Sequence, residues 1–145
     1  LKEKPALVSI MHANNEIGTI YPIEEIGTIC KKHNILFHVD AAQSLGKIPI
    51  DVKKMNVDFM SFSSHKIYGP KGVGALFVNN KHKNKIYPIT FGGGQENGLR
   101  PGTLPVPLII GFGEACKKAN SVMLSESKKI KKRIKKKLTR FYIMS

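Results

Sequence analysis

Apolar residues fall in short runs separated by polar, glycine-containing loops, and this spacing predicts a fold that alternates strands and helices. Residues 6–11, 35–39 and 57–62 are mostly apolar without strict alternation, which is typical of strands in a sheet covered on both faces. A Gly- and Pro-containing turn at 68–72 is followed by another apolar run at 73–78, which predicts a return strand. Residues 87–89 predict one more short strand.

Two helices are predicted between and after these strands. Pro22 opens the first, at a position where its missing N–H costs nothing. Its apolar face has helical spacing and consists of Ile23, Ile26, Ile29 and Cys30. The second is predicted over 107–118, and residues 51–55 predict a single helical turn. The order strand, helix, strand from residue 6 to residue 39 is that of a βαβ unit.

The formal net charge of +14 over 145 residues is concentrated in one part of the chain. From residue 117 onward there are 11 Lys or Arg and one acid, which leaves 13 basic and 9 acidic residues before it. Residues 120–145 predict a basic amphipathic helix whose apolar stripe packs on another domain. A surface for RNA or an acidic membrane is the alternative, but no aromatic residue lies among the lysines to stack bases.

Other features of the whole sequence argue against a membrane-spanning helix, a signal peptide and a disulfide. No run of roughly 18 apolar residues exists, so no transmembrane helix is predicted, and no signal peptide is visible. Cys30 and Cys116 lie far apart in helix-like patterns, which favours packed free thiols over a disulfide. The chain begins with Leu1 rather than Met and enters a strand-like run within a few residues, so we expect a fragment of a longer protein.

Lys66 offers the most specific chemistry. It comes just after a predicted strand, and ligands in open α/β sheets bind at the carboxyl ends of strands. A lysine held there can lose its proton and form a Schiff base with a carbonyl, although a solvated charge is the alternative. With pyridoxal phosphate, such a lysine also needs donors for the phosphate and a carboxylate facing the pyridine nitrogen. Ser63 and His65 are candidates for the first role, and Asp40 for the second.

Two other arrangements are candidates for ligand binding. The loop at 92–103, GGGQENGLRPGT, is either a flexible connector or a set of backbone N–H groups that, with Thr103, meets an anion. It lacks the Gly-Lys-Ser/Thr ending of a nucleoside-triphosphate loop, which excludes that class. His38 and Asp40 share one strand face and could bind a metal, but further ligands are missing, so no metal site is predicted.

Four segments, in this order, resemble a known family: MHANNEIG (11–18), FHVDAAQS (37–44), SFSSHKIYGPKG (61–72) and GGGQENGLRPGT (92–103). Together they resemble the cysteine desulfurases of the IscS/NifS type, in the class V aminotransferase group. The resemblance implies the central part of the large domain of a fold-type I pyridoxal-phosphate-dependent transferase, a three-layer αβα arrangement with a mostly parallel sheet. Residues 1–119 would be the partial cofactor-binding core, and 120–145 would lead to a C-terminal small domain.

The resemblance also implies a role for each matching residue. Lys66 matches the lysine that holds pyridoxal phosphate and later moves the proton, and Asp40 matches the carboxylate that pairs with the pyridine nitrogen. The other implied cofactor contacts are Asn15 and Gln43 near the ring and its phenolic oxygen, Ser63 and His65 at the phosphate, and Thr103 at the phosphate of a neighbouring subunit. The family's homodimer is therefore implied.

Each of the weaker assignments has a plainer alternative. Asn15 could cap its polar loop, Gln43 could satisfy backbone groups in a turn, and His65 could be a structural histidine. Pro101 stands where the family has Ser, and since Pro removes an N–H and a hydroxyl, it reshapes the loop that presents Thr103.

The implied reaction converts L-cysteine to L-alanine and leaves a persulfide for an iron–sulfur scaffold or another sulfur acceptor, including the one for tRNA thiolation. In the family, a C-terminal loop carries the nucleophilic cysteine, and neither Cys30 nor Cys116 matches its motif, so we expect the 145 residues alone to be inactive. The first alternative is another class V aminotransferase or a selenocysteine lyase. A non-catalytic basic domain that binds RNA or a membrane is a more remote alternative. The family type suggests a mitochondrial location, and otherwise a cytoplasmic one.

Overall fold

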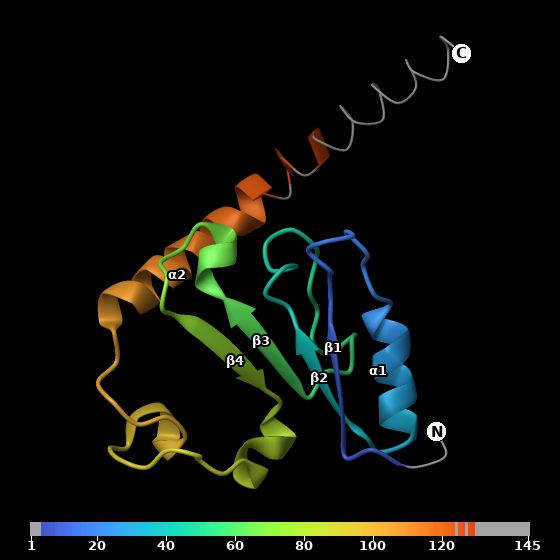
Figure 1. The fold of residues 1–145 in the computed structure, drawn as a ribbon, viewed down its shortest axis with the longest axis horizontal. Coiled ribbons are helices and arrows are strands. Elements are labelled where there is room, and N and C mark those ends of the chain that lie inside the picture. The colour runs from blue at the N-terminus through green and yellow to red at the C-terminus, as the bar shows by residue number, and fades with distance from the viewer. Residues whose placement is uncertain (1–3, 124, 127, 130–145) are drawn as a thin grey trace.

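A four-stranded sheet forms the centre of the computed structural model, which describes residues 4–123, 125–126 and 128–129 (Figure 1). The strands β1 (Leu7–Met11), β2 (Leu36–Asp40) and β3 (Phe59–Ser63) are parallel, and β4 (Gly74–Val78) runs antiparallel to β3. Helix α1 (Ile23–Lys32) connects β1 to β2, so the predicted βαβ unit is confirmed.

Charged residues at both ends favour helix α1. Glu24 and Glu25 lie in its first turn and Lys31 and Lys32 in its last, so the side-chain charges complement the helix dipole. Gly27 faces the connection before β3, where a Cβ atom would overlap the carbonyl oxygen of Met55. Glycine therefore lets the helix lie directly on that backbone.

The strand register divides the sheet into two unlike faces, because paired residues of neighbouring strands point the same way. One row packs into the core beneath α1: Ile10, Val39, Met60 and Phe77. The next row lies on the opposite face and is more exposed: Met11, Asp40, Ser61 and Leu76. Within the described part of the chain, the apolar core thus covers one face of the sheet and leaves the other open.

A second, smaller core joins the end of the sheet to helix α2 (Val106–Lys118). Phe112 of α2 packs with Ile67, which belongs to the short 3₁₀ helix η1 (Ser64–Ile67) directly after β3. Figure 1 shows α2 passing behind η1 at the carboxyl end of β3. This contact fixes the segment that carries His65 and Lys66.

Most of the predicted elements are confirmed, and one is wrong. No strand forms at 87–89 in the described structure, where the side chains of Tyr87 and Ile89 are 81% and 95% exposed. A strand needs a neighbour for its backbone hydrogen bonds, and this segment pairs with none of the described strands. Cys30 and Cys116 are both free thiols, as predicted.

The helix predicted over residues 120–145 can be compared with the structure only at its start. A π-helical turn at Ala119–Met123 extends α2, and most of the helix predicted over 120–145 lies outside the described residues. None of the helices in the described ranges has the length and apolar character needed to cross a membrane.

Candidate functional site

Three parallel strands end at one edge of the sheet, and the predicted site residues follow those ends. Asp40, the last residue of β2, pairs with Ser61 of β3, so Ser63 lies two residues further along the neighbouring strand and on the same face. The N–H of His12, just beyond β1, donates to the Asp40 carbonyl oxygen at 2.8 Å. The loop that carries Asn15 therefore begins beside Asp40.

The Asp40 side chain shapes the turn that follows it. Its Oδ1 accepts a hydrogen bond from the N–H of Ala42 at 2.9 Å, and the carboxylate is otherwise exposed. Gln43 lies half-buried in the same turn, whose backbone bonds are made by other groups, such as Leu45 N–H to the Ala41 carbonyl at 2.9 Å. The Gln43 side chain makes no hydrogen bond to the described residues, which leaves its amide available to a ligand.

Asn14, rather than Asn15, caps the polar loop after β1. The Asn14 Oδ1 accepts hydrogen bonds from the N–H groups of Glu16 and Ile17, at 2.9 and 3.1 Å. Asn15 is exposed, and its side chain has no hydrogen bond within the described ranges. The alternative that Asn15 caps the loop is therefore wrong, because Asn14 accepts the capping hydrogen bonds.

Lys66 and His65 lie on the outer side of η1, and both are exposed. Ile67 and Ser64 anchor the other side, at 2% and 0% exposure. The helix ends at Tyr68, whose φ of 62° is left-handed. Lys66 is thus accessible from solvent within the described part of the protein.

The loop that contains Thr103 lies apart from this group of residues (Figure 1). It contains the 3₁₀ helix η3 (Gln95–Gly98) and is closed by a hydrogen bond from the N–H of Gly102 to Gln95 Oε1 at 3.1 Å. The loop thus has a defined local structure and is more than a connector. Figure 1 shows this yellow segment beyond β4, at the opposite end of the sheet from η1.

The metal alternative at His38 finds no support in the described residues. Nδ1 of His38 hydrogen-bonds with the hydroxyl of Ser9 at 2.7 Å. No group of three or more His, Cys, Asp or Glu within those residues is arranged to hold a metal ion.

Sequence reasoning missed three polar groups near this edge. Lys47 is half-buried, and burial together with the positive charge of Lys66 lowers its pKa. His12 is buried, with its pKa lowered by that burial, and its Nδ1 has no hydrogen-bond partner among the described atoms. The buried Ser64 Oγ likewise has none. No pattern in the sequence marks these contacts, which depend on how the loops pack.

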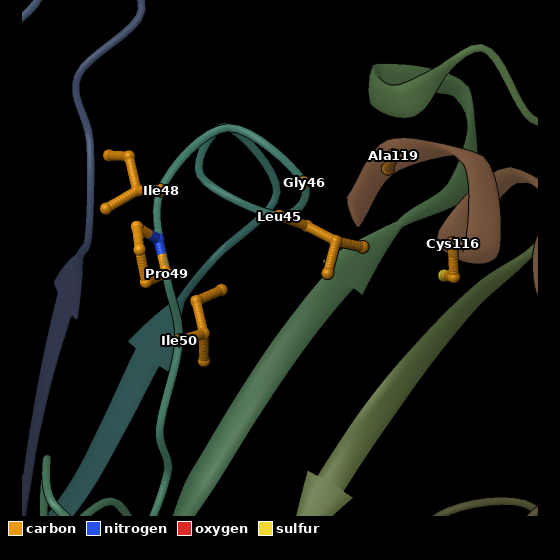
Figure 2. Close-up of a pocket in the computed structure, with 7 residues that line it drawn as sticks. All are labelled: Leu45, Gly46, Ile48, Pro49, Ile50, Cys116 and Ala119. Carbon is orange, nitrogen blue, oxygen red and sulfur yellow. The ribbon is translucent and has the colours of Figure 1, made fainter. Parts of the chain in front are cut away.

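A pocket of about 220 Å³ lies next to the site rather than within it. Figure 2 shows its lining side chains, which come from the loop after β2 and from the end of α2. These residues are Leu45, Gly46, Ile48, Pro49, Ile50, Cys116 and Ala119. The lining is apolar apart from the Cys116 thiol, whose pKa is raised by burial. The predicted polar residues instead lie on an open edge.

In open, mostly parallel α/β sheets, ligands bind at the carboxyl ends of the strands, and this is where the carboxylate, hydroxyls, imidazole and lysine of this chain lie. The chain belongs to the Aminotransferase class-V family, which matches residues 1–141. The family expected from the four sequence segments is therefore confirmed, and so is the α/β fold class.

Similar proteins with curated names show which members of the family the chain resembles. The chain is 61% identical to "Cysteine desulfurase, mitosomal" of Trachipleistophora hominis over 79% of this chain and 26% of that protein. It is 58% identical to "Cysteine desulfurase IscS" of Glaesserella parasuis over 86% of this chain and 31% of that one. The chain thus spans about a quarter of the length of the curated relatives that it matches.

Solved structures of similar proteins superpose on this chain. A NifS-like protein from Rickettsia africae superposes with a TM-score of 0.82 at 41% identity, covering 92% of this chain and 38% of that one. A second structure, "SspA in complex with cysteine", superposes with a TM-score of 0.74 at 54% identity, covering 77% and 32%.

Proposed function

We propose that this chain is the cofactor-binding part of a cysteine desulfurase, an enzyme that removes sulfur from L-cysteine and leaves L-alanine and a protein-bound persulfide. The observation that carries the proposal is the placement of Asp40 at the end of β2 and of Lys66 just after the adjacent strand β3, at one sheet edge. Relatives named cysteine desulfurase, at 53–61% identity, support the choice of reaction. One similar structure, that of SspA, is a complex with cysteine, which points the same way.

The residues at the edge fit pyridoxal phosphate, which when bound supplies a ring that accepts electrons from the substrate. The Lys66 amine would attach to the cofactor's aldehyde and afterwards accept or return a proton at its Nζ. Asp40 would face the pyridine nitrogen, because a carboxylate there keeps that nitrogen protonated. Asp40 is exposed, and its Oδ2 makes no hydrogen bond to the described residues, so that oxygen remains available for this contact.

The other donors would orient the cofactor. Ser63 and His65 would donate to its phosphate, since they lie on either side of the β3–η1 junction next to Lys66. Asn15 and Gln43 would contact the ring and its phenolic oxygen, which is consistent with their unused amide groups.

We further propose that Thr103 serves the site of a second copy of the protein. Its loop lies away from Lys66 (Figure 1), and the preceding segment exposes Tyr87, Ile89 and Phe91 by 81%, 95% and 86%. Several large apolar residues exposed in one short segment support a protein interface there. Ile89→Lys should therefore give a monomer in sedimentation analysis, whereas Ile29→Lys, at an exposed position on α1, should not.

The sulfur would pass to an iron–sulfur scaffold or another acceptor. Relatives named mitochondrial or mitosomal support a location in that kind of organelle, which fractionation of the source cells would test.

The deciding experiment is to locate the cofactor and the products in the full-length protein. Incubation with pyridoxal phosphate should give an absorbance band near roughly 400 nm, and borohydride reduction should fix the cofactor's mass on Lys66. Lys66→Ala should lose both signals and Lys71→Ala should keep them. With cysteine, alanine and transferable sulfur should form in equal amounts. A keto acid product would indicate an aminotransferase, and no cofactor on Lys66 would overturn the proposal.

A further inference from the structure

A buried carboxylate fastens the chain after β4 to the end of the sheet that lies opposite η1. Asp58, directly before β3, is buried, and its Oδ2 accepts the N–H of Phe37 in β2 at 3.0 Å. Its Oδ1 accepts hydrogen bonds from His82 Nε2 at 2.9 Å and from Lys81 Nζ at 2.7 Å. An ionised carboxylate only accepts, so His82 Nε2 carries the proton of its bond. Asp58 thus joins β2 and β3 to the 3₁₀ helix η2 (Asn80–Lys85).

His82 is the side chain that holds η2 to the fold. It is buried, and its ring centroid lies 5.6 Å from that of Phe59 in β3. Its N–H donates to the Asn79 carbonyl oxygen at 2.9 Å, and the N–H of Asn79 donates to the Asp58 carbonyl oxygen at 2.9 Å. The Lys81 side chain is mostly exposed. Because a hydrogen bond to a buried charge is stronger than one in water, His82 is the main anchor of this helix.

The segment that follows η2 has no anchor of its own. Residues 86–103 make no hydrogen bond to the rest of the described chain, and their bonds stay within the segment. One example is the bond from the N–H of Gly98 to the Gly94 carbonyl oxygen at 3.2 Å. The path of this segment, which contains Thr103, is therefore set where it leaves η2 and where it enters α2.

We propose that His82 is a positioning residue for Thr103, because its bond to Asp58 fixes where residues 86–103 leave the fold and so aims Thr103 at the cofactor phosphate of a second copy. This inference rests on the function proposed above. Asp58 and Lys66 lie at opposite ends of β3, whose five residues span roughly 16 Å. His82 therefore does not touch a cofactor held by Lys66 of its own chain, and it acts through the loop.

The first test measures cofactor affinity of the full-length protein from the absorbance band near roughly 400 nm. Thr103→Ala sets the scale, since losing one hydrogen bond to a charged phosphate weakens binding about tenfold or more. His82→Phe keeps a ring beside Phe59 but cannot bond to Asp58, and should weaken binding about threefold or more through the displaced loop. In the Thr103→Ala background it should have little further effect. Equal effects in both backgrounds would overturn the inference.

Mixed dimers show in which copy His82 acts. One copy carries Lys66→Ala, which removes its own cofactor attachment but leaves its loop intact. The other copy carries His82→Phe and keeps Lys66. The site on this second copy receives the intact loop of the first, so the mixed dimer should bind one cofactor with the affinity of the unmodified protein. Affinity as weak as in the His82→Phe homodimer would show that His82 acts within its own chain, and would overturn the inference.

Matched variants separate positioning from stability. His82→Gln can still donate an amide N–H to Asp58 and should retain binding. Asn79→Ala loosens η2 by another route, because Asn79 Oδ1 accepts the N–H of Lys81 at 3.2 Å, and should weaken binding. Asp51→Ala removes a similar cap from a turn elsewhere, where Asp51 Oδ1 accepts two backbone N–H groups, and should not. Equal losses of affinity in Asn79→Ala and Asp51→Ala would overturn the inference.

A second measurement needs no cofactor. Amide hydrogen exchange of residues 86–103 in the full-length protein should be faster in His82→Phe than in the unmodified protein, and unchanged in Asp51→Ala. Unchanged exchange in His82→Phe would overturn the anchoring role. If the unmodified protein never holds pyridoxal phosphate on Lys66, the proposed function fails instead, and the exchange result still decides whether His82 anchors the loop.

Discussion

Asp40 and Ser61 are direct partners on the neighbouring parallel strands β2 and β3, and they form the last pair of the register. The N–H of Ala41 donates to the Ser61 carbonyl oxygen at 2.9 Å, and the N–H of His12 donates to the Asp40 carbonyl at 2.8 Å. The backbone of Asp40 is thus held from both sides. Its side chain can be replaced without moving the strand end.

Asp40→Asn should therefore separate chemistry from folding. The asparagine oxygen can still accept the N–H of Ala42, so the free energy of unfolding should change by less than about 0.5 kcal/mol. Loss of the carboxylate charge should lower the rate of alanine formation by about a hundredfold or more. Asp40→Ala should lose the same activity and also about 1 kcal/mol of stability. Urea unfolding and an alanine assay measure the two effects, and a fully active Asp40→Asn protein would refute the role.

The element pattern could be predicted because it depends on local signals. Glu24, Glu25, Lys31 and Lys32 mark the two ends of α1, and the apolar runs match the strands within two residues. The site followed from the same signals, because polar residues directly after parallel strands must meet at one edge. The placement of Asp40 and Ser63 could be predicted for this reason.

What could not be predicted depends on contacts between distant segments. Residues 87–89 have the composition of a strand but no strand beside them in the described structure. Asn14 and Asn15 are chemically identical, and only the loop geometry decides which one caps it. The partial burial of Lys47 arises from the packing of the turn after β2, for which the sequence carries no periodic signal.

Asp58 should make the fold sensitive to acid. Burial raises the pKa of this carboxyl, but hydrogen bonds from Lys81, the N–H of Phe37 and His82 outweigh it, so the net pKa is lowered. The two side-chain bonds measure 2.7 Å for Lys81 Nζ and 2.9 Å for His82 Nε2. Because the folded pKa is below the unfolded value of about 3.9, ionised Asp58 stabilises the fold above that pH. The contribution disappears as the pH falls below about 4.

Asp58→Asn should accordingly destabilise the protein at pH 7 by about 2–3 kcal/mol, because hydrogen bonds to a buried charged group are lost. The difference from the unmodified protein should shrink when urea unfolding is repeated near pH 3. Lys81→Met is the control, since the Lys81 side chain is 59% exposed and its loss should cost about 0–1 kcal/mol. A difference that stays constant with pH would contradict the assignment.

Gly27 and Gly113 should respond in opposite ways to the same substitution. Both are helical, and alanine raises intrinsic helix stability by about 0.8–1 kcal/mol relative to glycine. At Gly113 a Cβ meets nothing within 4 Å, so Gly113→Ala should stabilise by about that amount. At Gly27 a Cβ would overlap the Met55 carbonyl oxygen, and Gly27→Ala should cost about 1–3 kcal/mol. Thermal unfolding of both variants checks the contrast, which equal shifts would contradict.

Ser64 and Gly69 should show strong coupling, because η1 closes on itself at this pair. The Gly69 N–H donates to the Ser64 carbonyl oxygen at 3.1 Å, and a Cβ at Gly69 would overlap Ser64 Oγ. That hydroxyl is buried and has no hydrogen-bond partner among the described atoms, so it costs desolvation energy without return. Ser64→Ala should therefore be neutral or stabilise the fold by about 1 kcal/mol.

The double-mutant cycle makes this prediction quantitative. Gly69→Ala alone should destabilise by about 1–3 kcal/mol through overpacking. In the Ser64→Ala background the overlapping oxygen is gone, so the same change should cost at least about 0.5 kcal/mol less. The contact with the Ala115 Cβ remains in both backgrounds, so part of the cost should persist. Equal costs of Gly69→Ala in the two backgrounds, measured by urea unfolding, would show that the hydroxyl does not limit the approach of the turn to η1.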